Sequence, residues 1–167
     1  MRYTCYAVAL LFAASTLFAE ERRTEISVFA SDLGYTVSDA AGSNFSGGVG
    51  LALNQWWTSR ISTQLSVTAE KHFSFRNTGA GLQRTTVREY PVDLVAQYHF
   101  PNQTRWQPYV GLGARAGDRI AGEINAGVLF QISPQLALTF DARRMQRETS
   151  EFHDSLMKFS IGLGWRF

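Results

Sequence analysis

The chain has 167 residues, of which 45% are hydrophobic and only 18% are charged. This composition excludes an intrinsically disordered protein and fits a single folded domain. The formal net charge is only +2, and no run of Lys and Arg exceeds two residues, so the sequence gives no indication of a nucleic-acid partner.

The N-terminus has the layout of an export signal. A basic start is followed by an apolar run at residues 5–19, CYAVALLFAASTLFA. This run is shorter than the roughly 20 residues of a membrane-spanning helix, so it predicts a signal peptide over residues 1–19. Cleavage is expected after Ala19 or, alternatively, after Ser15. The only cysteine, Cys5, lies in this segment, so the mature domain, residues 20–167, is expected to cross an oxidising periplasm without a thiol.

Apolar and polar residues alternate with a period of two along the mature chain, which predicts β-strands with two unlike faces. The first strand is the least regular. Eight strands are expected in all, at residues 24–35, 45–54, 61–73, 86–100, 108–117, 123–132, 136–143 and 158–167. The last of them, KFSIGLGWRF, shows the pattern most clearly, because its apolar side chains occupy one face while glycine and charged residues occupy the other.

The connections between these strands are of two kinds. Three are short, at residues 56–60, 101–106 and 133–135. Three others are longer and more polar, at residues 36–44, 74–85 and 144–154, and residues 117–122 are an intermediate case. Short and long connections alternate, so eight strands that close up and down place both termini at the end with the short turns.

Two closed barrels can produce this pattern. A soluble barrel of the lipocalin type turns its apolar face inward around a ligand, whereas an outer-membrane barrel turns it outward to lipid. Glycine is frequent on the polar face, which favours the second arrangement, because the interior of an eight-stranded barrel is only just wide enough for side chains. These glycines are Gly48, Gly50, Gly111, Gly113, Gly127, Gly162 and Gly164.

Acidic and basic residues on the polar face nearly balance, as they must if they are enclosed, since an unpaired buried charge is very costly. The sequence therefore predicts a charge network in the lumen, although a solvated charged face is the alternative explanation of the same residues. The network is predicted to consist of Glu70, Glu89, Asp93, Arg115, Glu123, Asp141, Arg143, Lys158 and Arg166.

Aromatic residues gather near the predicted strand ends, as in the interfacial girdles of membrane barrels. With the export signal, they favour an all-β fold: an eight-stranded antiparallel up-and-down transmembrane β-barrel. The predicted girdle residues are Phe45, Trp56, Trp57, Phe73, Tyr98, Phe100, Trp106, Tyr109, Trp165 and Phe167.

Two segments carry a resemblance to known proteins. The C-terminal SIGLGWRF resembles the assembly signal of Gram-negative outer-membrane barrels, and WQPYVGLGAR, residues 106–115, is similar to a strand of small barrels of the OmpA, OmpW and opacity-protein type. The resemblance implies a location in the outer membrane and contact with its lipid. It also implies that periplasmic chaperones escort the chain and that the barrel-assembly machinery recognises Ile161, Leu163, Trp165 and Phe167.

The leading functional hypothesis is a non-enzymatic outer-membrane protein with a largely filled, charged lumen and a structural or interaction role through its external loops. The sequence does not specify the ligand of those loops. One alternative is a narrow OmpW-like channel for small molecules, which rests on the WQPYVGLG resemblance. Another is a lipid-modifying barrel enzyme.

No catalytic, cofactor or metal site is predicted. Nucleophilic catalysis needs a Ser, a His base and an orienting carboxylate within reach of one another. His72 and Ser74 share a face beside Glu70, but the spacing is a weak signal, and the residues at 153–155, His-Asp-Ser, point to alternate faces. No Cys or close His pair in the mature chain gives the ligand spacing of a zinc site.

Overall fold

The computed structural model describes residues 23–33, 36–37, 45–77, 82–101, 103–117, 120–148 and 153–167, and these residues form ten strands. The predicted signal peptide lies outside them. None of the described residues form a helix long and apolar enough to cross a membrane. The strands are β1 (Arg23–Leu33), β2 (Thr36–Val37), β3 (Phe45–Trp56), β4 (Ile61–Asn77), β5 (Leu82–Glu89), β6 (Val92–His99), β7 (Trp106–Ala116), β8 (Ile120–Gln131), β9 (Leu136–Glu148) and β10 (His153–Arg166).

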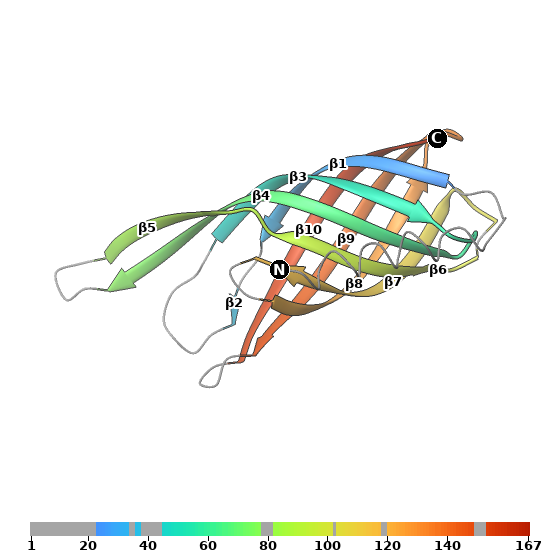
Figure 1. The fold of residues 1–167 in the computed structure, drawn as a ribbon. Coiled ribbons are helices and arrows are strands. Elements are labelled where there is room, and N and C mark those ends of the chain that lie inside the picture. The colour runs from blue at the N-terminus through green and yellow to red at the C-terminus, as the bar shows by residue number, and fades with distance from the viewer. Residues whose placement is uncertain are drawn as a thin grey trace, which may run out of the picture.

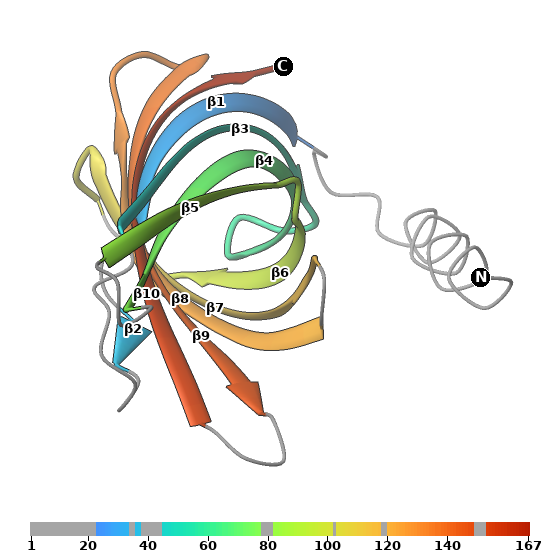
Figure 2. The same ribbon diagram turned by 90° about the vertical axis from the view of Figure 1, so that its left-hand side faces the viewer.

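The strands form one antiparallel sheet that closes on itself (Figure 2). Closure is made by β1, which pairs with β3 on one side and with β10 on the other, so that Val28 lies opposite both Leu51 and Leu163. Thr24 and Phe167 exchange two backbone hydrogen bonds, of 3.1 and 2.9 Å, where the first and last strands meet. A closed sheet has no edge with unpaired backbone groups, which is the condition for a β-structure to span lipid.

The segments β5 and β6 together make one strand of the barrel. Both pair with β4, and the register is the same on the two sides of the interruption, because Glu70 lies opposite Glu89 and Val67 opposite Val92. The break falls at Pro91, which has no backbone N–H to donate to the ladder. With β5 and β6 joined and β2 a two-residue addition to β10, eight strands close the barrel, and the prediction of an eight-stranded barrel is confirmed.

Two of the expected long loops are largely strand. Within the region expected as a loop at residues 74–85, residues 74–77 continue β4 and residues 82–85 begin β5, and these two strands extend beyond the body of the barrel (Figure 1). Likewise, β9 continues to Glu148 and β10 begins at His153, inside the expected loop at 144–154. The alternation of two unlike faces weakens there because a hairpin outside the membrane has no lipid on one side and no lumen on the other, whereas its backbone can still pair.

The two faces of the barrel are the reverse of those in a soluble protein. Along β6 every second side chain is buried, and the buried ones include Asp93, Gln97 and His99, while the apolar Leu94 and Tyr98 are exposed on the outside. The same alternation holds on β1, β4 and β10. The polar face therefore encloses the lumen and the apolar face forms the outer surface, as predicted for a transmembrane barrel.

Candidate functional site in the barrel lumen

Seven of the nine predicted network residues are buried side chains joined by ion pairs across the lumen. We call them the central charge cluster. It contains four carboxylates and three cations: Glu70, Asp93, Glu123, Asp141, Arg115, Arg143 and Lys158. Each side chain points inward because it occupies one of the alternate positions that form the polar face of its strand; these positions share one parity, odd or even, along the strand. The lumen is narrow enough for side chains from opposite walls to meet.

One half of the cluster is centred on Glu70 of β4. Its two carboxylate oxygens bind different cations: one accepts from the Arg115 guanidinium of β7 and the other from Lys158 Nζ of β10, at 2.9 Å. The Lys158 ammonium also donates to the Thr68 hydroxyl at 3.2 Å, and it lies 5.5 Å from the centre of the Phe29 ring. Glu70 thus connects three strands that are not neighbours in the sheet.

The other half of the cluster is centred on Arg143 of β9. Its guanidinium donates to Asp141 on the same strand, to Glu123 Oε1 on β8 at 3.0 Å and to Gln64 on β4. Asp93 joins the two halves, since one of its oxygens lies 3.6 Å from Arg143 and the other lies 3.7 Å from Arg115. The three cations together engage all four carboxylates, which offsets much of the desolvation cost of burying them.

A layer of rings lies between the central charge cluster and the short-turn end of the barrel. Tyr109 donates its hydroxyl to Asp141 Oδ2 at 2.7 Å, and its ring centre lies 5.3 Å from that of His99. The His99 ring in turn lies 4.1 Å from that of Trp56. The Arg166 guanidinium sits 4.9 Å from the centre of the Trp56 ring. We call Trp56, His99 and Tyr109 the ring layer.

This layer corrects two of the girdle predictions. Trp56 and Tyr109 were expected at the membrane interface, but both are buried inside the barrel, with 6% and 3% of their surface exposed. Position along a strand cannot separate an interfacial ring from a luminal one, whereas parity can. Trp56 shares the parity of the buried Asn54 on β3, and Tyr109 that of Arg115 on β7. Other girdle residues are exposed on the outside as expected, namely Tyr98, Phe100, Trp106, Trp165 and Phe167.

The two remaining network residues are Arg166 and Glu89. Arg166 forms a separate ion pair near the short-turn end, where its guanidinium donates to Glu25 Oε2 at 3.0 Å. Glu89 is half-buried and lies opposite Glu70 in the β4–β5 ladder. Glu25 was missed by the sequence analysis although only 1% of its surface is exposed. Its strand reads as irregular because an inward position is occupied by Phe29.

Glycine makes room for the large luminal side chains. A Cβ atom at Gly164 would lie 2.6 Å from the Glu25 carboxylate, and one at Gly127 would collide with the Tyr109 hydroxyl. In both places a neighbouring strand brings a long side chain over the glycine backbone. The glycine-rich polar face therefore reflects the close packing of a filled lumen.

The lumen also contains a Ser–His contact that the sequence does not reveal, because the two residues are 37 positions apart. Ser62 Oγ lies 2.8 Å from His99 Nε2 and also donates to Gln97 at 3.1 Å. Nδ1 of His99 has no partner among the described residues, so no carboxylate orients the ring. Ser62 is fully buried, and the arrangement lacks both the third member and the substrate access of a catalytic triad.

The structure does not describe the side chains of the other candidate catalytic residues, which are His72, Ser74 and residues 153–155. Within the described residues, no group of three His, Cys, Asp or Glu side chains is arranged to hold a metal ion.

The outer surface carries a continuous apolar belt over all the strands that close the barrel. The predicted assembly residues belong to this belt, since Ile161, Leu163, Trp165 and Phe167 are all exposed on the outside of the last strand and its terminus. Their parity is opposite to that of Lys158 and the luminal glycines of β10.

The family profile described as "Outer membrane protein beta-barrel domain" matches residues 4–167. The chain belongs to this family. This chain is therefore an outer-membrane protein that sits in the lipid bilayer. No curated protein sequence matches it.

Three solved outer-membrane barrels illustrate the shared fold. OprG from Pseudomonas aeruginosa has 12% identity and a TM-score of 0.64, with 87% of this chain and 95% of that one covered. Neisserial surface protein A (NspA) has 15% identity and a TM-score of 0.60, with 87% and 97% covered. The attachment invasion locus protein Ail of Yersinia pestis, in complex with the heparin analogue sucrose octasulfate, has 16% identity and a TM-score of 0.55, with 88% and 99% covered.

Proposed function

We propose that this outer-membrane barrel is a closed, non-enzymatic protein that serves a structural or interaction role at its external end. The observation that carries the proposal is the central charge cluster, whose ion pairs cross the lumen. Contacts from β4 to β7 and β10, and from β9 back to β4, place side chains across the axis. A solute that moved along the axis would have to break several of these charge-assisted hydrogen bonds at once.

The space left inside supports a closed lumen. A cavity of about 20 Å³ lies beside the central charge cluster, lined by residues that include Tyr109, Asp141 and Arg143. A space of this size holds about one water molecule and no hydrated ion. Eight-stranded barrels in general are filled by their side chains, in contrast to porins of sixteen or more strands, which enclose an aqueous channel.

Planar-bilayer recording tests this proposal. The mature protein, refolded and inserted into a bilayer, is expected to give no current steps above those of the protein-free membrane. The Arg144→Ala variant is expected to give none either, because Arg144 is exposed on the outside and does not face the lumen. Large, ion-selective steps in both proteins would contradict the closed lumen and would favour the narrow-channel alternative.

An external role is supported by the shape of the barrel. The β4–β5 hairpin extends well beyond the other strands at the end opposite the short turns (Figure 1), and long hairpins of outer-membrane barrels face the exterior. Ail, which has the same fold, was solved with a heparin analogue, so a small barrel can present a binding surface. Deleting the far part of the hairpin, residues 74–85, is expected to leave the cold gel mobility of the folded barrel intact while abolishing any surface binding of the parent protein.

The non-enzymatic part of the proposal is supported by the Ser62–His99 contact. It has the hydrogen-bond distance of a nucleophile and its base, but both side chains are buried in the lumen, where the Trp56 ring packs on that of His99. The Ser62→Ala variant should therefore leave the lipid composition of the outer membrane unchanged. A change in acyl-chain content that depends on Ser62 would establish an enzyme.

We also propose that the last strand is read by the barrel-assembly machinery after chaperoned transit of the periplasm. The support is the exposed apolar row that ends at Phe167. Deleting Phe167 would also remove its hydrogen bonds with Thr24, so the sharper variant is Phe167→Ser, which keeps the backbone. This variant should reach the outer membrane poorly, whereas Ile124→Ser on another outward face should assemble. Equal amounts of heat-modifiable barrel in envelopes from both variants would contradict recognition through Phe167.

A further inference from the structure

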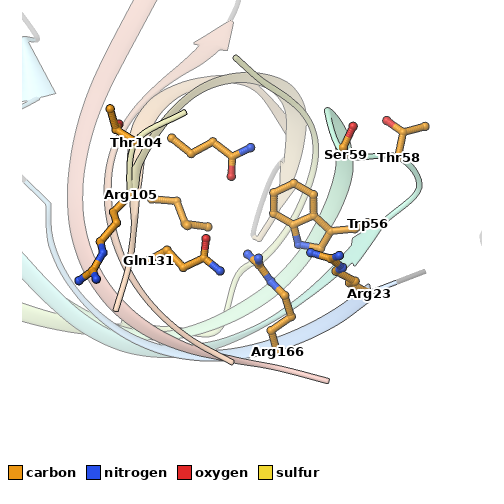
Figure 3. Close-up of a pocket in the computed structure, with 10 residues that line it drawn as sticks. Arg23, Trp56, Thr58, Ser59, Thr104, Arg105, Gln131 and Arg166 are labelled. Atoms are coloured by element: carbon orange, nitrogen blue, oxygen red, sulfur yellow. The ribbon is translucent and has the colours of Figure 1, made fainter. Parts of the chain in front are cut away.

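A polar cavity of about 460 Å³ opens at the short-turn end of the lumen, beyond the ring layer (Figure 3). Its volume falls in the range of small-molecule sites. In outer-membrane barrels the short turns face the periplasm, so this cavity opens to the periplasmic side. Its lining includes Arg23, Trp56, Arg105 and Arg166.

The lining carries three positive charges and no negative one. Arg23 and Arg166 come from the first and last strands, which pair beside one another, and Arg105 comes from the short turn before β7. Outside the lining, the Glu25 carboxylate binds one terminal nitrogen of Arg166 at 3.0 Å and accepts from the Asn54 amide at 3.2 Å. A cavity lined in this way attracts anions and raises their local concentration.

Two buried donors in the wall of this cavity have no acceptor among the residues that the structure describes. They are the indole Nε1–H of Trp56 and the Nε–H of Arg166. Only 6% of Trp56 and 10% of the Arg166 side chain are exposed, so bulk water satisfies neither donor fully. Figure 3 shows the indole nitrogen on the side of the ring that faces the Arg166 and Arg23 guanidinium groups.

The geometry of these donors is fixed before any ligand arrives. The Arg166 guanidinium is held by Glu25 and by the face of the Trp56 ring, 4.9 Å away. The indole packs on His99 of the ring layer. Buried donors without acceptors are rare in folded proteins, and each is costly unless a ligand or an ordered water completes it. Pre-positioned donors lower the ordering cost of binding.

We propose that this periplasmic mouth cavity binds a phosphate group, carried by a small phosphate ester or by a phospholipid headgroup of the inner leaflet. The phosphate oxygens accept from Trp56 Nε1, from Arg166 Nε and from the guanidinium of Arg105. Guanidinium groups match phosphate geometry well, and the hydroxyl and amide side chains of Thr58, Ser59, Gln107 and Gln131 suit a hydroxyl-bearing carrier. Both sources present the same phosphate chemistry at this end of the barrel.

The test is a titration followed by the indole N–H resonance of Trp56 in the refolded mature protein. The protein is held in an uncharged sugar-detergent micelle at constant ionic strength, and the resonance is assigned with Trp56→Phe. Glycerol 3-phosphate is the soluble probe, and glycerol is its uncharged match. In a second arm, phosphatidylglycerol is added to the micelles.

A saturable shift with glycerol 3-phosphate, and none with glycerol, assigns the site to soluble phosphate esters. A shift with phosphatidylglycerol alone assigns it to the lipid headgroup. Arg105→Gln should weaken the binding by at least roughly tenfold, the effect of one charge-assisted hydrogen bond. Arg60→Gln is the matched control, because Arg60 is exposed in the neighbouring short turn but does not line the cavity.

Two results would overturn the proposal. One is the absence of a saturable shift with either phosphate probe, which would show that the cavity contains water and binds no phosphate. The other is an equal loss of binding in Arg105→Gln and Arg60→Gln, which would show diffuse attraction by the basic end of the barrel instead of a site.

Discussion

Replacing Arg143 with Met should destabilise the barrel strongly, because it removes the cation at the centre of one half of the lumen. The central charge cluster would keep its four carboxylates but only two of its three cations. Glu123 would lose its 3.0 Å contact and Asp93 its 3.6 Å contact, and Asp141 would lose the guanidinium beside it. Removing one partner of a buried ion pair costs about 3 to 5 kcal/mol. Methionine retains the apolar stem, so lost packing adds little.

The measurement is equilibrium unfolding in urea of protein refolded into phospholipid vesicles, followed by tryptophan fluorescence and cold gel mobility. Arg144→Met serves as the control, since it makes the same change on the outer face. Adding Glu123→Gln to Arg143→Met should recover part of the loss, because it removes one of the carboxylates left without a cation. The reasoning would be refuted if Arg143→Met and Arg144→Met differed by less than about 1 kcal/mol, the range of exposed pairs.

Five further substitutions test the lumen and the outer face by the same urea titration. Gly113→Ala should cost about 1 to 3 kcal/mol, since its Cβ would lie 2.8 Å from Val95 Cα. Gly122→Ala, which meets nothing within 4 Å, should be neutral or stabilising. Tyr109→Phe should cost about 1.5 to 3 kcal/mol, because the carboxylate 2.7 Å from its hydroxyl loses a donor. Leu112→Arg at the centre of the apolar belt should cost about 2 to 4 kcal/mol, and Ile120→Arg near the strand end much less. Equal effects within either matched pair would contradict the assigned packing or depth.

The architecture could be predicted because a transmembrane barrel imposes the same period on every strand. Asp93 and Leu94 occupy alternate positions, so they must lie on opposite faces of the wall. The glycine content and the balanced charge of the face that carries Asp93 then indicated that this face encloses the lumen. The aromatic residues were harder to assign, since a ring near a strand end suits both the interface and the mouth of the lumen. Only the parity of Trp56 and Tyr109, counted from their buried neighbours, separates the two locations.

Partners across the lumen could not be predicted, because they depend on register and on the distance between opposite walls. Balanced charge indicated that pairs exist but not that Glu70 would bind both Arg115 and Lys158. Glu25 was missed because Phe29 breaks the polar pattern of its strand. That ring lies beside Gly50, where a Cβ atom would overlap it, so a large side chain on one strand is accommodated by glycine on the next.

The central claim is that the polar face encloses the lumen and the apolar face meets lipid, and two tryptophans near the same end of the barrel test it directly. Trp56 is buried in the lumen, whereas 56% of Trp165 is exposed on the outside. Each can be made the single tryptophan by replacing the other three with Phe, and its fluorescence measured in vesicles of phospholipids brominated along their acyl chains. The account predicts strong quenching of Trp165 and little quenching of Trp56. Strong quenching of Trp56 with Trp165 protected would contradict it.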